Sequence, residues 1–333
     1  MITVAALPAQ PPSWKRQLRD AFRDLDALLQ TLGLNRNQLA LDAESNFPLL
    51  VPQSFAARMR HGDPRDPLLL QVLPLASERA LTPGYVADPV GDLEQTRARG
   101  VIQKYAHRVL LVTTGSCAVH CRYCFRRHFP YSEELAAVGE WRGAVAQIAS
   151  DPSIHEVILS GGDPLSLATH KLRSLTDALA KLPQIRRLRV HTRWPIVLPA
   201  RVDDELCQWL EGLPWPTVFV VHANHAQELD GSVADAVARL RAAGTTLLNQ
   251  AVLLKGINDS IDAQCTLSEA AIGAGIVPYY LHLLDPVAGA AHFQVSERAA
   301  RRILHAMRAK LPGYLVPRLA REVPGRSSKT VLL

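Results

Sequence analysis

Short β-branched runs alternate with amphipathic segments along most of the chain. The runs that predict strands cover 108–114, 156–160, 187–192, 217–222, 245–254 and 277–284. The segments with apolar residues at helical spacing cover 133–150, 166–182, 203–212, 232–243, 260–274 and 296–311. Strands and helices that alternate in this way favour parallel strands joined by right-handed crossovers. The pattern therefore predicts an α/β fold, a partial (β/α)6 barrel that is open and related to the eight-unit TIM barrel.

The chain before residue 105 follows another pattern, in which helical spacing is interrupted by prolines. The stretch 13–33 has apolar residues at helical spacing, with Ser13 as a candidate N-cap and Gly33 at its end. These boundaries predict a mainly helical N-terminal region over 1–104, the barrel over 105–312 and a short C-terminal segment over 313–333.

Reactive or glycine-rich sequence follows nearly every predicted strand. In order along the chain these stretches are TTGSCAVHCRYC, SGGDP, HTRWP, HANHAQE, an Asn-Gln pair within the fifth strand, and Asp285. In parallel α/β barrels the catalytic residues lie at the C-terminal ends of the strands. Their common position predicts one active-site mouth.

Composition narrows the class of protein. The chain has 333 residues, 48% of them hydrophobic and 20% charged, as in ordinary globular proteins. No apolar run approaches the roughly 20 residues that span a membrane, and the N-terminal sequence lacks the pattern of a secretory signal. We therefore expect a cytoplasmic protein without a membrane partner. Five cysteines, three of them clustered, favour a metal or redox site over a disulfide framework.

The formal net charge of +6 raises the possibility of a nucleic-acid partner. The basic residues are spread along the chain, and many stand on helical faces such as ERAARRILHAMRAK, where a solvated face is the usual explanation. No direct contact with nucleic acid is expected.

The clustered cysteines, Cys117, Cys121 and Cys124, have the spacing C-x3-C-x2-C. A zinc site would need a fourth ligand, which His120 or His128 could supply. The alternative is a [4Fe-4S] cluster held by three thiolates, with one iron open to an outside ligand.

This spacing on a loop after the first strand, with an aromatic residue before the last cysteine, resembles the signature of radical S-adenosylmethionine (SAM) enzymes. The segment LSGGDPL resembles their glycine-rich SAM-binding segment, which implies SAM contacts from Ser160, Gly161, Gly162 and Asp163. The resemblance implies that SAM chelates the open iron and that an electron from the cluster cleaves it to a 5′-deoxyadenosyl radical.

Residues 97–330 resemble the lysine 2,3-aminomutase family. The segments that carry the resemblance are KYAHRVLLVTTGSCAVHCRYCFRR, VILSGGDPL, RVHTRWPIVLPARV, NHAQEL, LLNQAVLLKGIND, PYYLHLLDPVAGAAHF and GYLVPRLAREVPGRSSKT. The resemblance implies pyridoxal 5′-phosphate (PLP) as a second cofactor, bound covalently by Lys329. Moving an amino group to C3 of lysine needs a radical to remove an unactivated hydrogen and an imine to PLP to carry the nitrogen.

Further residue roles are implied by the same resemblance. Arg126 would bind the substrate carboxylate, and Asp285 and Glu322 would bind the ε-ammonium of L-lysine. The family has Asp where this chain has Glu322, so the side chain is one methylene longer. Without the resemblance, Asp285 would be interpreted as a helix N-cap followed by Pro286.

The same segments imply further contacts to the two cofactors. The resemblance implies contacts to the PLP phosphate from Lys104, Tyr105 and Arg108, and places His225 and Gln250 near SAM.

The chain stops four residues after Lys329. Together with Glu322, this short form resembles the subgroup that makes (R)-β-lysine for elongation factor P, to which a separate lysyl ligase attaches it. A reductant such as flavodoxin is implied. The alternatives are a metabolic lysine 2,3-aminomutase and, from another class, a zinc-stabilised RNA-binding protein.

Overall fold

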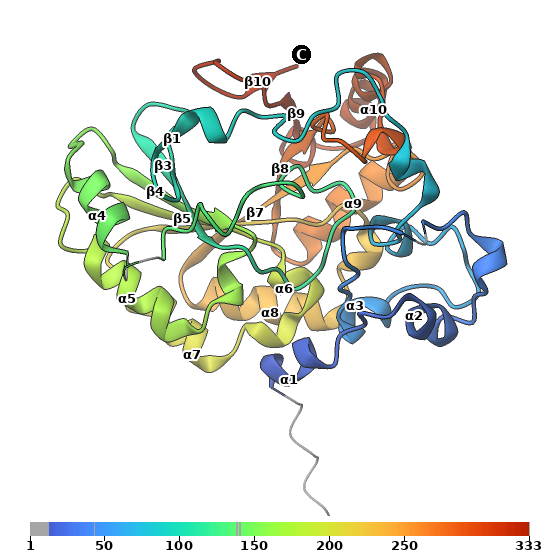
Figure 1. The fold of residues 1–333 in the computed structure, drawn as a ribbon, viewed down its shortest axis with the longest axis horizontal. Coiled ribbons are helices and arrows are strands. Elements are labelled where there is room, and N and C mark those ends of the chain that lie inside the picture. The colour runs from blue at the N-terminus through green and yellow to red at the C-terminus, as the bar shows by residue number, and fades with distance from the viewer. Residues whose placement is uncertain (1–12, 43, 138, 140, 333) are drawn as a thin grey trace, which may run out of the picture.

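A single ten-stranded sheet organises the protein (Figure 1). The computed structural model describes residues 13–42, 44–137, 139 and 141–332. The strands follow each other across the sheet in chain order: β1 (Thr96–Ala98), β2 (Val101–Ile102), β3 (Arg108–Thr114), β4 (Glu156–Gly161), β5 (Arg187–Thr192), β6 (Thr217–Val221), β7 (Thr245–Val252), β8 (Val277–His282), β9 (Arg318–Arg321) and β10 (Thr330–Val331). Strands β3 to β9 run parallel, whereas β1, β2 and β10 join the two edges in antiparallel pairs.

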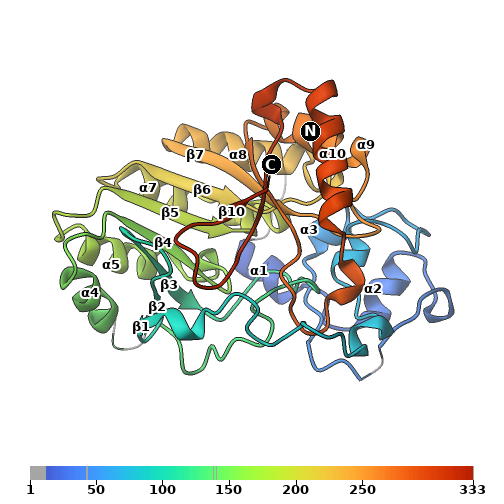
Figure 2. The same ribbon diagram turned by 90° about the horizontal axis from the view of Figure 1, so that it is seen from above.

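The helices of the barrel follow the outer side of the sheet (Figure 2). The α-helices in chain order are α1 (Trp14–Arg19), α2 (Leu25–Thr31), α3 (Gln53–Ala56), α4 (Arg142–Ala149), α5 (Thr169–Leu179), α6 (Trp194–Val197), α7 (Asp204–Glu211), α8 (Gly231–Ala242), α9 (Ile261–Gly273) and α10 (Glu297–Lys310). The six predicted strands and the six predicted barrel helices are present, so the partial-barrel α/β fold is confirmed.

Side chains alternate between the two faces of the sheet. On β5, Leu188 and Val190 are buried in the core between sheet and helices, so Arg189 and His191 point to the barrel interior. On β9, Leu319 joins the same core. On β5 this alternation gives the inner face to polar side chains.

The predicted helix over 133–150 is too long. Among the described residues of this stretch, only Arg142–Ala149 is helical, because Trp141 at its N-cap adopts a left-handed backbone with φ +70° before the helix begins. The parallel strand β9 was not predicted, because RLAR is too short and too polar to stand out as a strand.

The single helix expected over 13–33 is also wrong. The structure has two helices, α1 and α2, separated by an extended segment in which Phe22 pairs with Val51 through backbone hydrogen bonds of 2.8 and 3.0 Å. The Asp24 side chain accepts from the N–H groups of Asp26 and Ala27 and so begins α2. Ser13 stands at the N-cap of α1 without a side-chain capping bond, and Gly33 with φ +66° follows α2 as expected.

The N-terminal region packs onto the barrel. Phe55 is fully buried in the same hydrophobic core as Val190, and the Ser54 hydroxyl donates to the carbonyl of Val197 at 2.8 Å. Arg58 donates to the carbonyls of Ile196, at 2.6 Å, and of Glu228. The division at 104/105 and 312/313 stays a prediction.

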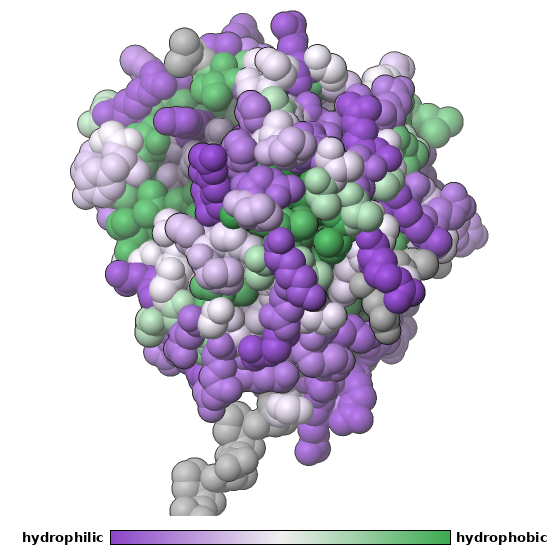
Figure 3. Space-filling model, turned by 90° about the vertical axis from the view of Figure 1, so that its left-hand side faces the viewer, coloured by the Kyte–Doolittle hydropathy of each residue, from purple (hydrophilic) through white to green (hydrophobic). Residues whose placement is uncertain are grey.

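Hydrophilic residues dominate the face shown in Figure 3, with apolar residues in small patches. Within the described residues, no helix is long and apolar enough to cross a membrane. Most of the N-terminal stretch used to judge a secretory signal, residues 1–12, lies outside the described residues.

Candidate active site

The three clustered cysteines lie on the loop that follows β3. Burial raises the pKa of the Cys117 thiol well above its usual value, and Asp163, Cys124 and Cys121 add to the rise. Burial, with Cys121, raises the pKa of Cys124 to about 11. Each thiol therefore lies within electrostatic reach of the others in a poorly solvated place. Thiolates in such a place need cations, so the donor set fits an iron–sulfur cluster.

The cysteines are not arranged around one point. Across the described part of the chain, no three His, Cys, Asp or Glu side chains are grouped so that they could hold a metal ion. A zinc site needs all its ligand atoms about 2.0–2.3 Å from one ion, whereas a cubane binds each thiolate to a different iron.

Arg193 is a residue that the sequence interpretation missed. Its Nη1 donates to Cys121 Sγ at 2.8 Å, and its Nη2 donates to Gln71 Oε1 at 2.7 Å and Glu228 Oε2 at 2.9 Å. Glu228 is fully buried, so the guanidinium is fixed from behind. Arg193 is the arginine of the stretch HTRWP, and its position at the end of a strand could have identified it as a candidate site residue.

The glycine-rich segment after β4 packs directly on the cluster loop. A Cβ on Gly162 would stand 2.5 Å from the carbonyl oxygen of Ser116, and Gly161 has φ +119°. The N–H of Gly162 donates to the Thr114 carbonyl at 2.6 Å, and that of Asp163 to the Ser116 carbonyl at 2.8 Å. Only glycine permits this approach of two backbones.

Asp163 fixes the position of the next strand end. Its carboxylate accepts from the Thr192 hydroxyl at 2.7 Å and from the Arg193 N–H at 2.6 Å. Burial raises the pKa of Asp163 to about 7, and these hydrogen bonds act in the opposite direction. Asp163 is therefore a structural link between the glycine-rich segment and Arg193. Ser160, just before the segment, is buried and accepts from Arg126.

At the other side of the barrel mouth, the C-terminal segment brings Lys329 next to Glu322. Lys329 Nζ and Glu322 Oε2 are 2.9 Å apart, and the Tyr105 hydroxyl donates to Glu322 Oε1. Lys329 Nζ lies 6.0 Å from the centre of the Tyr280 ring. Burial raises the pKa of Glu322, but Lys329, Tyr105 and Lys104 outweigh it and hold that pKa below its usual value. Glu322 thus already binds a primary ammonium.

Asp285 stands in the loop after β8. Burial raises its pKa to about 7; Lys329 lowers that pKa and Glu322 raises it, so both lie within electrostatic reach of Asp285. No helix begins at Asp285, because Pro286 and the next residues form a loop that bridges to Val86. The N-cap interpretation of Asp285 is therefore wrong.

Arg126 and Lys104 meet at a second residue that the sequence did not reveal, Asp92. Arg126 Nε and Lys104 Nζ each lie 2.7 Å from an Asp92 carboxylate oxygen. Arg108, at the start of β3, has its guanidinium 4.7 Å from the centre of the Tyr105 ring. Glu322 contacts Lys104, Tyr105 and Lys329, so these four residues form one cluster.

The two residues expected near SAM lie on neighbouring parts of the barrel. His225 follows β6, and its Nδ1 accepts from the Gln227 N–H at 3.2 Å. Burial lowers the pKa of His225, although Glu228 opposes the change, so the ring is neutral at pH 7. Gln250 is on β7, paired in register with Tyr280 of β8.

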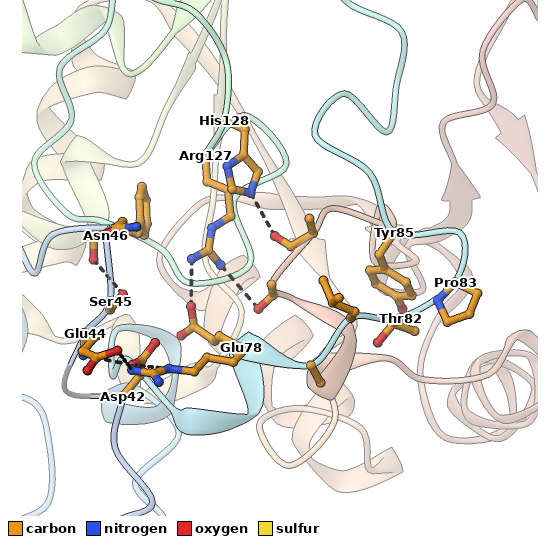
Figure 4. A pocket seen from close by; sticks show the side chains of 16 residues that line it. Asp42, Glu44, Ser45, Asn46, Glu78, Thr82, Pro83, Tyr85, Arg127 and His128 are labelled. Atoms are coloured by element: carbon orange, nitrogen blue, oxygen red, sulfur yellow. Dashed lines mark hydrogen bonds and ion pairs between the residues drawn. The ribbon is translucent and has the colours of Figure 1, made fainter.

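A surface pocket of about 780 Å³ opens beside the end of the cluster loop (Figure 4). Arg127 points into the wall of this pocket and binds Glu78 at 2.8 Å, and His128 contacts the Ala288 carbonyl at 3.1 Å. Its lining residues include Asp42 and Tyr85 but neither Lys329 nor Asp285. The pocket is therefore separate from the candidate active site.

Comparison with known proteins decides the family. The chain is 45% identical over 322 residues to an L-lysine 2,3-aminomutase of Escherichia coli (strain K12), covering 96% of this chain and 94% of that protein. It is 42% identical to an L-lysine 2,3-aminomutase of Haemophilus influenzae, covering 98% of each. The chain belongs to the L-lysine 2,3-aminomutase family. It is an enzyme of the isomerase class, and the radical SAM assignment made from the cysteine motif is confirmed.

No family model matches the chain. Among solved structures, a radical SAM methyltransferase from Sphaerobacter thermophilus is similar with a TM-score of 0.46 and 17% identity, covering 66% of this chain and 68% of that one. At this level of likeness the match carries no weight for function. Enzymes of the L-lysine 2,3-aminomutase family combine a [4Fe-4S] cluster, SAM and PLP, and the donor set around Cys117 and the lysine at 329 fit those groups.

Proposed function

We propose that this aminomutase converts L-lysine to β-lysine at the mouth of the barrel, with PLP on Lys329 and SAM on a cluster held by Cys117, Cys121 and Cys124. The observation that carries the proposal is the distribution of charge around Lys329. Glu322 and Asp285 offer negative charge on its side of the mouth, and Arg126 offers a guanidinium. A diamino acid with one carboxylate and a distal ammonium needs that combination.

The cofactors supply a carbon radical that removes an unactivated hydrogen and an imine through which nitrogen migrates. The residues of the chain would orient these cofactors and the substrate and enclose them. Lys329, which lies near Tyr280, would hold PLP, and Lys104, Tyr105 and Arg108 would bind its phosphate. The residues that would bind SAM are Ser160, Gly161, Gly162, Asp163, His225 and Gln250, and Arg193 orients Cys121 from behind.

We further propose that the product is (R)-β-lysine and that it serves elongation factor P. Support comes from Glu322, which stands where metabolic lysine 2,3-aminomutases have Asp. The functional partners are then elongation factor P, its lysyl ligase and a reductant such as flavodoxin. A metabolic aminomutase, which would release β-lysine for catabolism or as an osmolyte, is the second candidate because it uses the same site.

The test combines the reconstituted enzyme with elongation factor P and its lysyl ligase. We expect elongation factor P to gain a β-lysyl group, identified by peptide mass spectrometry after hydrolysis and chiral separation, only when L-lysine, SAM and reductant are present. The matched control omits SAM. Accumulation of free β-lysine that the ligase does not use would support the metabolic candidate instead.

A further inference from the structure

A segment from the N-terminal region lies across the barrel mouth. This strap, residues 84–95, connects to the loop after β8, where the Val86 N–H donates to the Pro286 carbonyl at 2.9 Å. It also lies beside the C-terminal segment, because a Cβ added at Gly91, which has φ +64°, would stand 3.5 Å from the Pro324 side chain. The strap is therefore held by both segments that carry the acids of the site.

The strap presents one carboxylate, that of Asp92, to two cations. Its Oδ2 accepts from Arg126 Nε and its Oδ1 from Lys104 Nζ, both at 2.7 Å, and the side chain is 2% exposed. The carboxylate of Asp88 accepts from the N–H of Asp92 at 3.0 Å, which fixes the backbone beneath it. Burial raises the pKa of Asp92, but Arg126 and Lys104 more than offset this and keep it ionised.

Of the two cations, Arg126 keeps a donor group free for a ligand. Arg126 Nη1 donates to Ser160 Oγ at 3.2 Å, and Nη2 makes no hydrogen bond to another residue in the described ranges. Lys104 Nζ also donates to the Val90 carbonyl at 2.7 Å and lies 4.0 Å from Glu322 Oε1. Asp92 is shared by both cations, Glu322 lies near Lys104 as a second carboxylate, and buried cations without a counter-charge would be costly.

We propose that Asp92 is a positioning residue that holds Arg126 for the substrate carboxylate and Lys104 for the PLP phosphate at the same time. Arg and Lys side chains lose much rotamer freedom when fixed, so a shared anchor lowers the entropic cost of binding each ligand. The inference rests on the proposed function, which assigns those two ligands. It adds that binding of PLP and binding of lysine both depend on one carboxylate outside the barrel strands.

The test compares Asp92→Asn with Asp66→Asn in the full-length, cluster-loaded enzyme. Asp66 is also fully buried, but its carboxylate accepts from the backbone N–H groups of Arg60, Leu68 and Leu69 and from Gln227 Nε2. The dissociation constant of PLP is measured by absorbance, and that of L-lysine by equilibrium dialysis with PLP present and no reductant. We expect Asp92→Asn to raise each constant about tenfold or more and Asp66→Asn to change neither, while both lower Tm.

A double-mutant cycle separates positioning from general damage. If Asp92 acts through Lys104, Asp92→Asn should have little further effect on PLP affinity once Lys104→Met is present. The same holds for lysine affinity in the Arg126→Met background. Effects that simply add in both cycles, or an Asp66→Asn variant that loses as much affinity as Asp92→Asn, would overturn the inference.

The wild-type titrations distinguish this inference from the proposed function. Wild type that binds PLP but not L-lysine would contradict the proposed substrate, and the PLP arm would still decide the role of Asp92 toward Lys104. Wild type that binds neither ligand would overturn both.

Discussion

Asp285 gives the site a measurable dependence on pH. Burial raises its pKa to about 7, so below that value the acid is mostly neutral and cannot pair with an ammonium. The lysine ε-ammonium, with a pKa of about 10.4, stays charged throughout. Affinity for L-lysine should therefore increase as pH rises from 6 to 8, by up to about tenfold, because the ionised fraction of Asp285 increases by that order.

Equilibrium dialysis without reductant measures this affinity apart from turnover. Asp163 also has a pKa of about 7, so the Asp285→Asn variant is the necessary control. It should bind lysine weakly and without a pH step near 7. A step that persists in Asp285→Asn belongs to another group and would remove Asp285 from the amine site.

Glu322 tests the departure from the metabolic family. Its carboxylate reaches both Lys329 and the Tyr105 hydroxyl. Glu322→Gln leaves a buried ammonium without its counter-charge and should cost about 2 to 4 kcal/mol, roughly 30- to 1,000-fold in the KM for lysine. Glu322→Asp shortens the side chain in a pocket shaped for Glu, so its KM should also rise, by less. A Glu322→Asp variant with a lower KM than wild type would refute this account of the pocket.

Lys329 should be the residue that borohydride links to PLP. Reduction of the PLP-loaded wild type, followed by peptide mapping, should recover the cofactor on the C-terminal peptide, because Lys329 lies between Glu322 and Tyr280 in the mouth. Lys329→Ala should retain iron and SAM binding but show no PLP linkage. Recovery of PLP on another lysine would displace the assignment.

Among the structural elements, the contact between the glycine-rich segment and the cluster loop is sensitive to added volume. Gly162→Ala places a methyl group 2.5 Å from the Ser116 carbonyl, so the loop must move, at a cost of about 1 to 3 kcal/mol. Gly143→Ala, in α4 with nothing within 4 Å, should be neutral or stabilise by up to about 1 kcal/mol. Thermal unfolding and iron content measure both; equal effects on the two variants would contradict the packing argument.

Elements differ in how far the sequence could reveal them. Strands β3 and β5 agree with the predicted bounds, because a buried parallel strand needs a run of apolar or alternating residues. The prediction of one helix over 13–33 was wrong because the spacing of apolar residues does not reveal that Phe22 pairs with Val51, which is distant in the sequence. Tertiary contacts outweighed helical periodicity there.

The residues of the candidate site also differ in whether the sequence could reveal them. Cysteine spacing predicted Cys117 as a cluster ligand, and the family resemblance predicted Arg126 as a substrate contact. Asp92 carries no motif and stands 34 residues before the arginine that it binds. Only the fold places such a partner, because a counter-ion is selected by proximity in space and not by local pattern.

At the scale of the whole molecule, the mouth is assembled from three separate parts of the chain. The strap contributes Asp92, the barrel contributes the cluster loop and Asp285, and the C-terminal segment contributes Glu322 and Lys329. The strap and the last segment also lie close together, because a methyl group added at Gly91 would come within 3.5 Å of the Pro324 side chain. Cofactor binding and folding of these segments should therefore support each other.

This assembly is expected to move the amino group of L-lysine from C2 to C3. The most direct measurement is anaerobic reconstitution with iron, sulfide, PLP, SAM and reductant, followed by chiral chromatography of the products formed from L-lysine. The account predicts (R)-β-lysine from wild type and none from Cys121→Ala, which leaves the cluster with two protein thiolates. Wild type that holds the cluster, binds PLP at Lys329 and cleaves SAM but forms no β-lysine would contradict it.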